Sequence, residues 1–274
     1  MCENSDGKNE QYTEEQDSTD LKTENEDPGL KQRLKNKFKT LGIAIGLGIS
    51  GYSLTILWYI PFRKTALTNG SSTMMLTQYI VSALAAVTIG AIYLKYTDKG
   101  TDYIDINIPN KKSFYTMVGG VIALLLILYT ISVFTSFFEV EAADHSIQQS
   151  MVTTTTDPRF ILLMMPLSIL VIGPSEEFVY RNLMQKRLYK DFRKWSAVIL
   201  SSIVFAAIHY PTYANGDLPS VLVSLGTVFS LSLLLGFIYA WTENLVTVAF
   251  VHGTYNAALF GQLYLEMTRG IVII

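Results

Sequence analysis

Three short groups of residues in the second half of the chain could support hydrolysis, and the first holds two adjacent carboxylates. It reads Glu176-Glu177-Phe178-Val179-Tyr180-Arg181. On a helix, Glu177 and Arg181 lie one turn apart and are expected to form an ion pair. Glu176 is displaced by about 100° around the axis and has no such partner. A carboxylic acid in an apolar cavity suits a general base or acid near neutral pH. A salt-bridged helix end is the alternative interpretation, but it leaves Glu176 unexplained.

The other two groups each contribute a histidine. Phe205-Ala-Ala-Ile-His209 closes a short apolar run, where a lone histidine would more often be a cap or an interfacial residue. His252-Gly-Thr-Tyr-Asn256 places two side chains on one helix face. They could donate together to a developing oxyanion, or join helices through hydrogen bonds. Together with Glu176, they supply a base, a water-positioning group and an oxyanion stabiliser for amide hydrolysis.

A zinc site is the other chemistry open to these residues. Glu176, His209 and His252 could act as ligands to one zinc ion. The His-Glu-x-x-His signature is absent, so a zinc site of the soluble-protease type is not indicated. The single cysteine, Cys2, excludes an internal disulfide and a cysteine-based zinc site. The third histidine, His145, falls in an acidic loop and is expected to have no role.

The elements that must position these residues are membrane helices. Hydrophobic residues make up 50% of the chain and charged residues 16%, against about 25% charged in a typical soluble domain. A span needs about 20 apolar residues, and we expect seven spans, within a range of six to eight. They lie near 40–60, 74–94, 114–138, 159–185, 196–210, 219–241 and 244–265. The predicted fold class is therefore all-α, a polytopic helical membrane protein.

Loop charges predict the orientation of these spans. Basic residues cluster at 31–39, 95–112 and 186–194, whereas the loop at 139–157 is acidic. Because basic loops stay cytoplasmic, we expect a multi-pass protein of the cell membrane with a cytoplasmic N-terminus. Residues 1–30 are expected to be a disordered acidic cytoplasmic tail, followed by a helical transmembrane domain at 31–265. No cleavable signal peptide is visible.

The three groups, in this order within apolar helices, resemble the motifs of the CPBP family. This is the CAAX prenyl protease type II and bacteriocin-processing (Abi) family of intramembrane endopeptidases, and the resemblance covers about 115–265. It implies a catalytic cavity facing the cytosol. By this likeness, Glu176 would activate the hydrolytic water and His209 would help to hold it. The remaining implied residues are His252 and Asn256 for the oxyanion, with Glu177, Arg181 and Phe205 in support. Members are described both as metalloproteases and as metal-independent glutamate proteases.

The leading functional hypothesis is therefore an intramembrane endopeptidase. Its expected partners are membrane lipid and a membrane-associated substrate, either a peptide or a prenylated CAAX-type protein, and no nucleic acid is expected. A non-catalytic scaffold or bacteriocin-immunity protein of the same fold is the main alternative, because a fold does not fix function. Buried ionisable groups also occur in proton- or cation-coupled transporters. A serine protease using Ser175 is a weaker alternative, since Pro174 more simply marks a helix irregularity.

Overall fold

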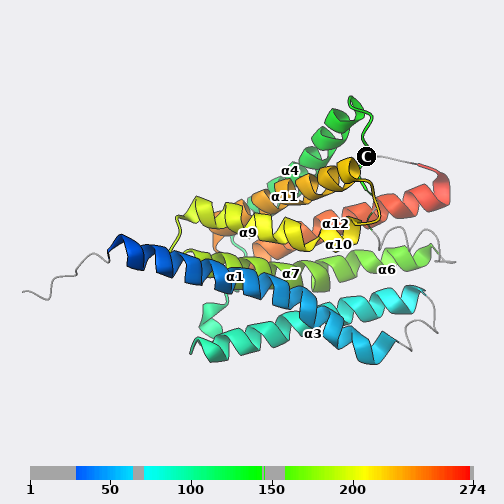
Figure 1. Cartoon of the computed structure of the whole chain (residues 1–274). Helices are drawn as coiled ribbons and strands as arrows, with labels where there is room; N and C mark the ends of the chain where they lie inside the picture. Colours follow the sequence, from blue (N-terminus) through cyan, green and yellow to red (C-terminus); the bar gives the residue numbers. More distant parts are fainter. Residues whose placement is uncertain (1–28, 64–70, 144, 146–157, 272–274) are drawn as a thin grey trace, which may run out of the picture.

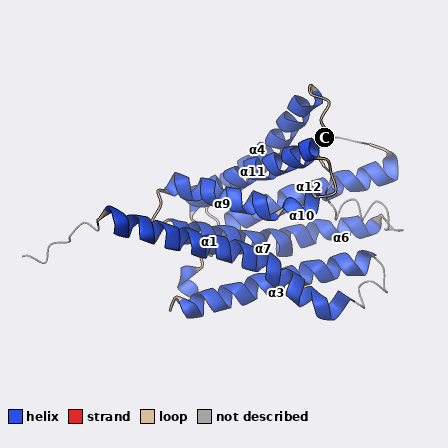
Figure 2. Ribbon diagram, viewed as in Figure 1, coloured by secondary structure: helices blue, strands red, loops and turns tan. Residues whose placement is uncertain are grey.

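The computed structural model describes residues 29–63, 71–143, 145 and 158–271, and within this part of the chain every regular element is a helix (Figure 2). The predicted all-α fold class is confirmed. The acidic tail expected at 1–30 lies outside the described residues, apart from its last two positions, Gly29 and Leu30. Leu30 already begins the first helix, so the basic residues at 31–39 are helical.

Seven helical segments run side by side (Figure 1). Each coincides with one of the seven expected spans. The unbroken ones are α1 (Leu30–Tyr59), α3 (Ser71–Tyr96), α4 (Lys111–Ser136), α9 (Lys194–Ile208), α11 (Leu218–Thr242) and α12 (Leu245–Arg269). Short turns follow three of the long helices: η1 (Ile60–Phe62), η2 (Thr101–Tyr103) and α10 (Tyr210–Tyr213).

The seventh segment, Arg159–Leu188, is the irregular one. It consists of α6 (Arg159–Leu167), η3 (Ser168–Ile172), α7 (Gly173–Glu177), η4 (Phe178–Gln185) and α8 (Lys186–Leu188), where η3 and η4 are π-helical. Pro166 and Pro174 lack the amide hydrogen that would continue the α-helical bonding pattern. Because π-turns inside α-helices are frequent at functional sites, this irregularity around Glu176 and Glu177 marks the segment for attention.

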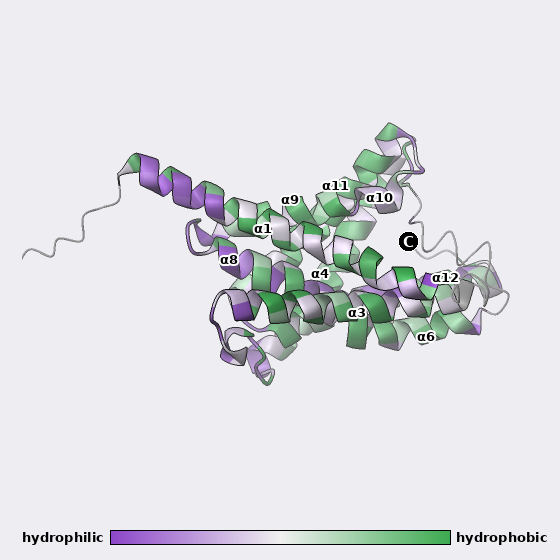
Figure 3. Cartoon of the chain, turned by 60° about the horizontal axis from the view of Figure 1, so that its bottom comes forward, coloured by the Kyte–Doolittle hydropathy of each residue, from purple (hydrophilic) through white to green (hydrophobic). Residues whose placement is uncertain are grey.

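Length and composition qualify five segments of the described chain as membrane spans. They are Leu30–Phe62, Thr73–Tyr96, Lys111–Ser136, Arg159–Leu188 and Leu218–Thr242. Helix α9 is apolar but shorter, and α12 is not among the five. Helix α12 carries His252, Asn256 and further polar residues, which lower its hydropathy. Figure 3 shows mainly apolar helices with polar colour gathered at the start of α1 and around α8. The chain is a multi-pass membrane protein.

The centre of the bundle is formed by α12 and the irregular segment. Helix α12 packs against α4, α6, α7 and η3, while α1 lies beside α3 and η4. One core cluster joins the irregular segment to α1 and α9 around Leu183 and Met184, and a second joins α4, α11 and α12 around Leu124 and Val248. Both glutamates therefore come from the irregular segment and His252 from α12, two elements that pack against each other.

Candidate active site

Two glycines bring the glutamate-bearing and histidine-bearing helices into backbone contact. A Cβ on Gly173 would lie 2.5 Å from the Ala249 carbonyl oxygen, and a Cβ on Gly253 would lie 2.6 Å from the Ser168 carbonyl oxygen. Since real Cβ atoms do not approach backbone so closely, only glycine fits at both positions. Gly253 directly follows His252 in the sequence. This close packing is what allows the histidine to reach the neighbouring carboxylates.

A chain of buried charges crosses this contact. The Arg181 Nε donates to Glu177 Oε2 at 2.9 Å, so the expected ion pair is present, and both side chains are fully buried. The other Glu177 oxygen lies 2.8 Å from His252 Nδ1. Arg181 Nη2 also donates to Ser232 Oγ at 2.9 Å. Because an ionised carboxylate only accepts hydrogen bonds, His252 Nδ1 carries a proton, and its Nε2 is directed to Glu176 Oε2 at 3.7 Å.

Glu176 differs from Glu177 in its surroundings. Its side chain is 33% exposed, whereas that of Glu177 is fully buried. The 3.7 Å separation from His252 is too long for a direct hydrogen bond. The two adjacent carboxylates therefore differ in exposure. Glu177 is buried and holds His252 in its orientation, whereas Glu176 is accessible to a solvent molecule.

His209 is held at the end of α9 by its own helix. Its Nδ1 lies 2.7 Å from the Phe205 carbonyl oxygen, which fixes the ring and leaves Nε2 available. Phe205 stacks its ring near three of the site residues. Its centroid is 4.5 Å from that of His209, 6.3 Å from that of His252 and 5.4 Å from the Arg181 guanidinium carbon. Phe205 therefore separates the two histidines and covers the buried guanidinium.

One cavity of about 810 Å³ collects the predicted residues. Glu176, His209, His252 and Asn256 all line it, and so does Phe205. Glu177 and Arg181 lie behind the wall. The structure thus brings together residues separated by up to 80 positions in the sequence, with donors, an acceptor and an accessible carboxylate facing a common space. That arrangement can hold a water molecule and a peptide carbonyl next to each other.

The same residues do not form a ready zinc site. Among the described residues, no group of three or more His, Cys, Asp or Glu side chains is arranged to hold a metal ion. His252 Nδ1 and His209 Nδ1 are engaged by Glu177 and by a backbone carbonyl, which leaves Nε2 as the nitrogen of each ring that could bind a ligand. The predicted ligands Glu176, His209 and His252 share the cavity but are not arranged around one metal position.

Sequence reasoning missed several cavity residues, because their signal lies in packing. His145, which we expected to have no role, lines the cavity and packs edge-on against Tyr213 with ring centroids 5.5 Å apart. Burial, with a smaller contribution from nearby His209, lowers the pKa of His145 to about 4. Burial raises the pKa of Tyr213 to about 12. Tyr79 is a further lining residue, and so is Ser175, the residue of the weaker serine-protease alternative. The one signal visible in the sequence was Gly253, which directly follows His252 and allows the close helix contact described above.

These features define a class: a multi-pass membrane protein whose helices enclose a carboxylate, two imidazoles and an amide in one cavity. A family model described as type II CAAX prenyl endopeptidase Rce1-like matches residues 158–258. No curated protein and no solved structure matches the chain.

This match is consistent with the CPBP family that the motifs resemble. The matched stretch contains all seven predicted site residues and is shorter than the core expected at about 115–265. Helices α1, α3 and α4 lie outside it but complete the cavity wall.

Proposed function

We propose that the protein is an intramembrane endopeptidase that hydrolyses a peptide bond of a membrane-associated substrate, with Glu176 as the general base. The single observation that carries the proposal is the division of the two carboxylates. Glu177 is fully buried between Arg181 and His252, while Glu176 faces the cavity that His209 and Asn256 also line. The Rce1-like match supports a protease of this family.

In the proposed reaction, water occupies the cavity between Glu176 and His209. Glu176 accepts a proton from this water as its oxygen attacks the carbonyl carbon of the scissile amide. Negative charge develops on the carbonyl oxygen, and the Asn256 amide and His252 donate to it. The carbon–nitrogen bond then breaks while Glu176 returns the proton to the leaving amine, which yields a carboxylic acid and an amine.

His252 can donate to the oxyanion only if its Nε2 also carries a proton. The Glu177 carboxylate at 2.8 Å stabilises the resulting imidazolium, and Arg181 holds that carboxylate in place. In this proposal, Glu177 and Arg181 position His252 without touching the substrate. The two successive glutamates then have separate roles.

The test is Glu176→Gln in purified protein reconstituted into liposomes. The probes are a farnesylated CAAX-type peptide and a set of acyl-anchored peptides of varied sequence, with products identified by mass spectrometry. Loss of a general base is expected to lower the rate by about 10²–10⁴-fold. Glu243→Gln is the matched control, since Glu243 is an exposed carboxylate that does not line the cavity, and a change within about threefold is expected.

Two outcomes contradict the proposal. A Glu176→Gln protein that cleaves within about threefold of the wild type would remove Glu176 as the base. A correctly folded wild-type protein that cleaves none of the anchored peptides would favour the scaffold or immunity alternative. Zinc dependence is tested by adding a chelator and by metal analysis. If the metal-free reaction proposed here is right, the cleavage rate stays unchanged and the purified protein contains no metal.

A further inference from the structure

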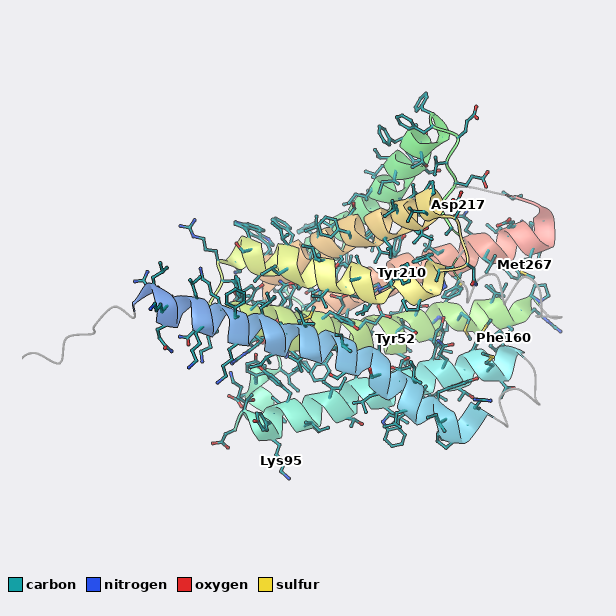
Figure 4. All side chains as sticks on the ribbon, viewed as in Figure 1. Tyr52, Lys95, Phe160, Tyr210, Asp217 and Met267 are labelled. Carbon is teal, nitrogen blue, oxygen red and sulfur yellow. The ribbon has the colours of Figure 1, made fainter. Side chains whose placement is uncertain are left out.

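Four basic residues meet where two membrane spans end on the same side of the bundle. They are Lys99, just after α3, and Lys186, Arg187 and Lys190, at and just beyond the end of the irregular segment, and we call them the basic cluster. Figure 3 shows polar colour around α8, and Figure 4 shows Lys95, in the last turn of α3, at this end of the bundle. None of the four lines the 810 Å³ cavity, so the basic cluster is separate from the candidate active site.

The ring of Tyr103 holds two members of the basic cluster close together. Its centroid lies 3.9 Å from Lys99 Nζ and 4.3 Å from Lys186 Nζ. The ring itself packs against Tyr93 of α3, with centroids 5.9 Å apart. Lys186 is also fixed by the Asp105 carboxylate at 2.6 Å and by the Tyr103 carbonyl oxygen at 2.7 Å. The position of the cluster is therefore set by packing and hydrogen bonds.

The positive charge of the basic cluster exceeds the negative charge that pairs with it. Lys186 has a carboxylate partner, whereas Lys99, Arg187 and Lys190 form no ion pair within the described part of the chain. Burial lowers the pKa of Lys99, its three cationic neighbours lower it further, and nearby Asp102 opposes them. Because like charges held close together repel, a bound anion would stabilise this arrangement.

Arg187 adds a buried donor to the basic cluster. Its Nε is buried and has no hydrogen-bond partner among the described residues. Its charge acts on Lys99 and on Tyr103, so the guanidinium lies on the same side as the two ammonium groups. A buried donor without a partner is destabilising, and a guanidinium presents a planar fork of donors that matches the oxygens of a phosphate group. The cluster therefore has both the charge and the donors of an anion-binding site.

We propose that the basic cluster binds a phosphate group, that of the headgroup of an anionic phospholipid. Lys99 lies just beyond the span Thr73–Tyr96, and Arg187 lies in the last turn of the span Arg159–Leu188. Headgroups lie at this depth, directly outside the hydrocarbon core. Basic pockets between membrane helices are typical binding sites for anionic headgroups. The placement depends on where the spans end and is the same whichever side of the membrane this end faces.

The surroundings of the basic cluster favour a lipid over a soluble phosphate. Tyr96, the last residue of α3, is 91% exposed, and tyrosine rings at the ends of spans lie among lipid headgroups. Lys99 and Lys190 are exposed, so a headgroup can reach them from the membrane surface. A phosphate held between Lys99 and Arg187 would join the loop after α3 to the irregular segment. Binding should therefore stabilise the folded protein.

The test is lipid binding to the purified full-length protein in a nonionic detergent, measured by native mass spectrometry and by the midpoint of thermal unfolding. The probes are phosphatidylglycerol, phosphatidylcholine with the same acyl chains, and soluble glycerol phosphate. We expect phosphatidylglycerol to bind most tightly and to raise the unfolding midpoint. Arg187→Gln and Lys99→Gln should each weaken its binding about fivefold or more, because each removes a charge-assisted hydrogen bond. Lys111→Gln is the matched control, since Lys111 is an exposed lysine at the start of α4 outside the cluster, and a change within about twofold is expected.

Three results would overturn the proposal. Equal weakening in Lys111→Gln and in the cluster variants would mean a diffuse attraction to negative charge, without a site. Equal affinity for phosphatidylcholine would remove the selection for an anionic headgroup, and equal affinity for glycerol phosphate would assign the site to a soluble ligand. Lys99 is exposed, so Lys99→Gln keeps the test decisive if Arg187→Gln does not fold. The readout is binding, so its outcome is independent of whether the protein cleaves peptides.

Discussion

Polar residues are arranged differently in two regions of the molecule. The first region is the end of the bundle at which α4, α9 and α12 begin, here called the basic end. There, the Asp105 amide donates to Asn182, the Asp105 carboxylate accepts from Lys186, and the loop that carries Asp105 is fixed in place. The second region is the cavity, which Glu176 and His209 face. The comparison separates polar groups that stabilise the fold by pairing from the accessible groups that we propose for catalysis. Between the two regions, Glu177 and Arg181 form a buried ion pair, and Glu177 also holds His252.

Removing one partner of that central pair should produce the largest loss of stability. Arg181→Met leaves Glu177 buried without its cation, which typically costs about 3–5 kcal/mol. Lys194→Met is the matched control, because it breaks the exposed pair with Glu243, and exposed pairs contribute about 0–1 kcal/mol. Denaturant unfolding in detergent micelles measures both. Equal effects from the two substitutions would contradict the distinction between the buried pair and the surface pair.

The second-largest loss of stability is expected from adding a methyl group between the two central helices. Gly253→Ala places a Cβ 2.6 Å from backbone of the neighbouring helix, and overpacking of this kind typically costs about 1–3 kcal/mol. Because the shift separates His252 from Glu176, cleavage should fall as well. Gly261→Ala on the same helix meets only the Met165 side chain at 3.5 Å, and we expect it to be neutral or slightly stabilising. Wild-type activity in Gly253→Ala would show that the backbone contact does not set the site.

A single hydrogen bond at the basic end should affect stability but not cleavage. Tyr239→Phe removes the donor to Asp105, and a typical net loss is about 1 kcal/mol. The rate of cleavage at saturating substrate should stay within about twofold, since Asp105 is separated from the cavity by packed side chains. Tyr210→Phe, at an exposed tyrosine, is the control and should change neither quantity. A large fall in rate with Tyr239→Phe would mean that the basic end takes part in catalysis.

The smallest expected effect is a pH dependence that arises at His145, which lines the cavity. Burial lowers the pKa of His145 to about 4, whereas an unfolded histidine has a pKa of about 6.5. As the pH falls below about 6.5, the unfolded chain binds this proton first, so stability declines between about pH 6.5 and pH 4, by roughly 1 kcal/mol at pH 5.5.

Replacing His145 should remove that component of the pH dependence. The measurement is the midpoint of thermal unfolding at pH 7.5 and pH 5.5 for the wild type and for His145→Gln. The wild type should lose more stability on acidification than the variant does. An identical loss in both proteins would show that His145 is solvated rather than buried at the edge of the cavity.

The sequence by itself determined the all-α membrane fold and the positions of the seven helical segments. Those features depend on local apolar length and on turn signals, which need no knowledge of contacts. It also determined the ion pair of Glu177 and Arg181, because helical spacing makes residues four apart neighbours. The motifs pointed to the residues that line the cavity, and they did so by resemblance rather than by derivation.

Only the tertiary structure decided which glutamate is buried and which residues line the cavity. The contact of Gly173 and Gly253 with opposing backbone, the engagement of His252 by Glu177 and the lining position of His145 all join segments far apart in the chain. Such contacts depend on how helices pack in space, and the hydrophobic periodicity of a helix does not identify the helix against which it packs.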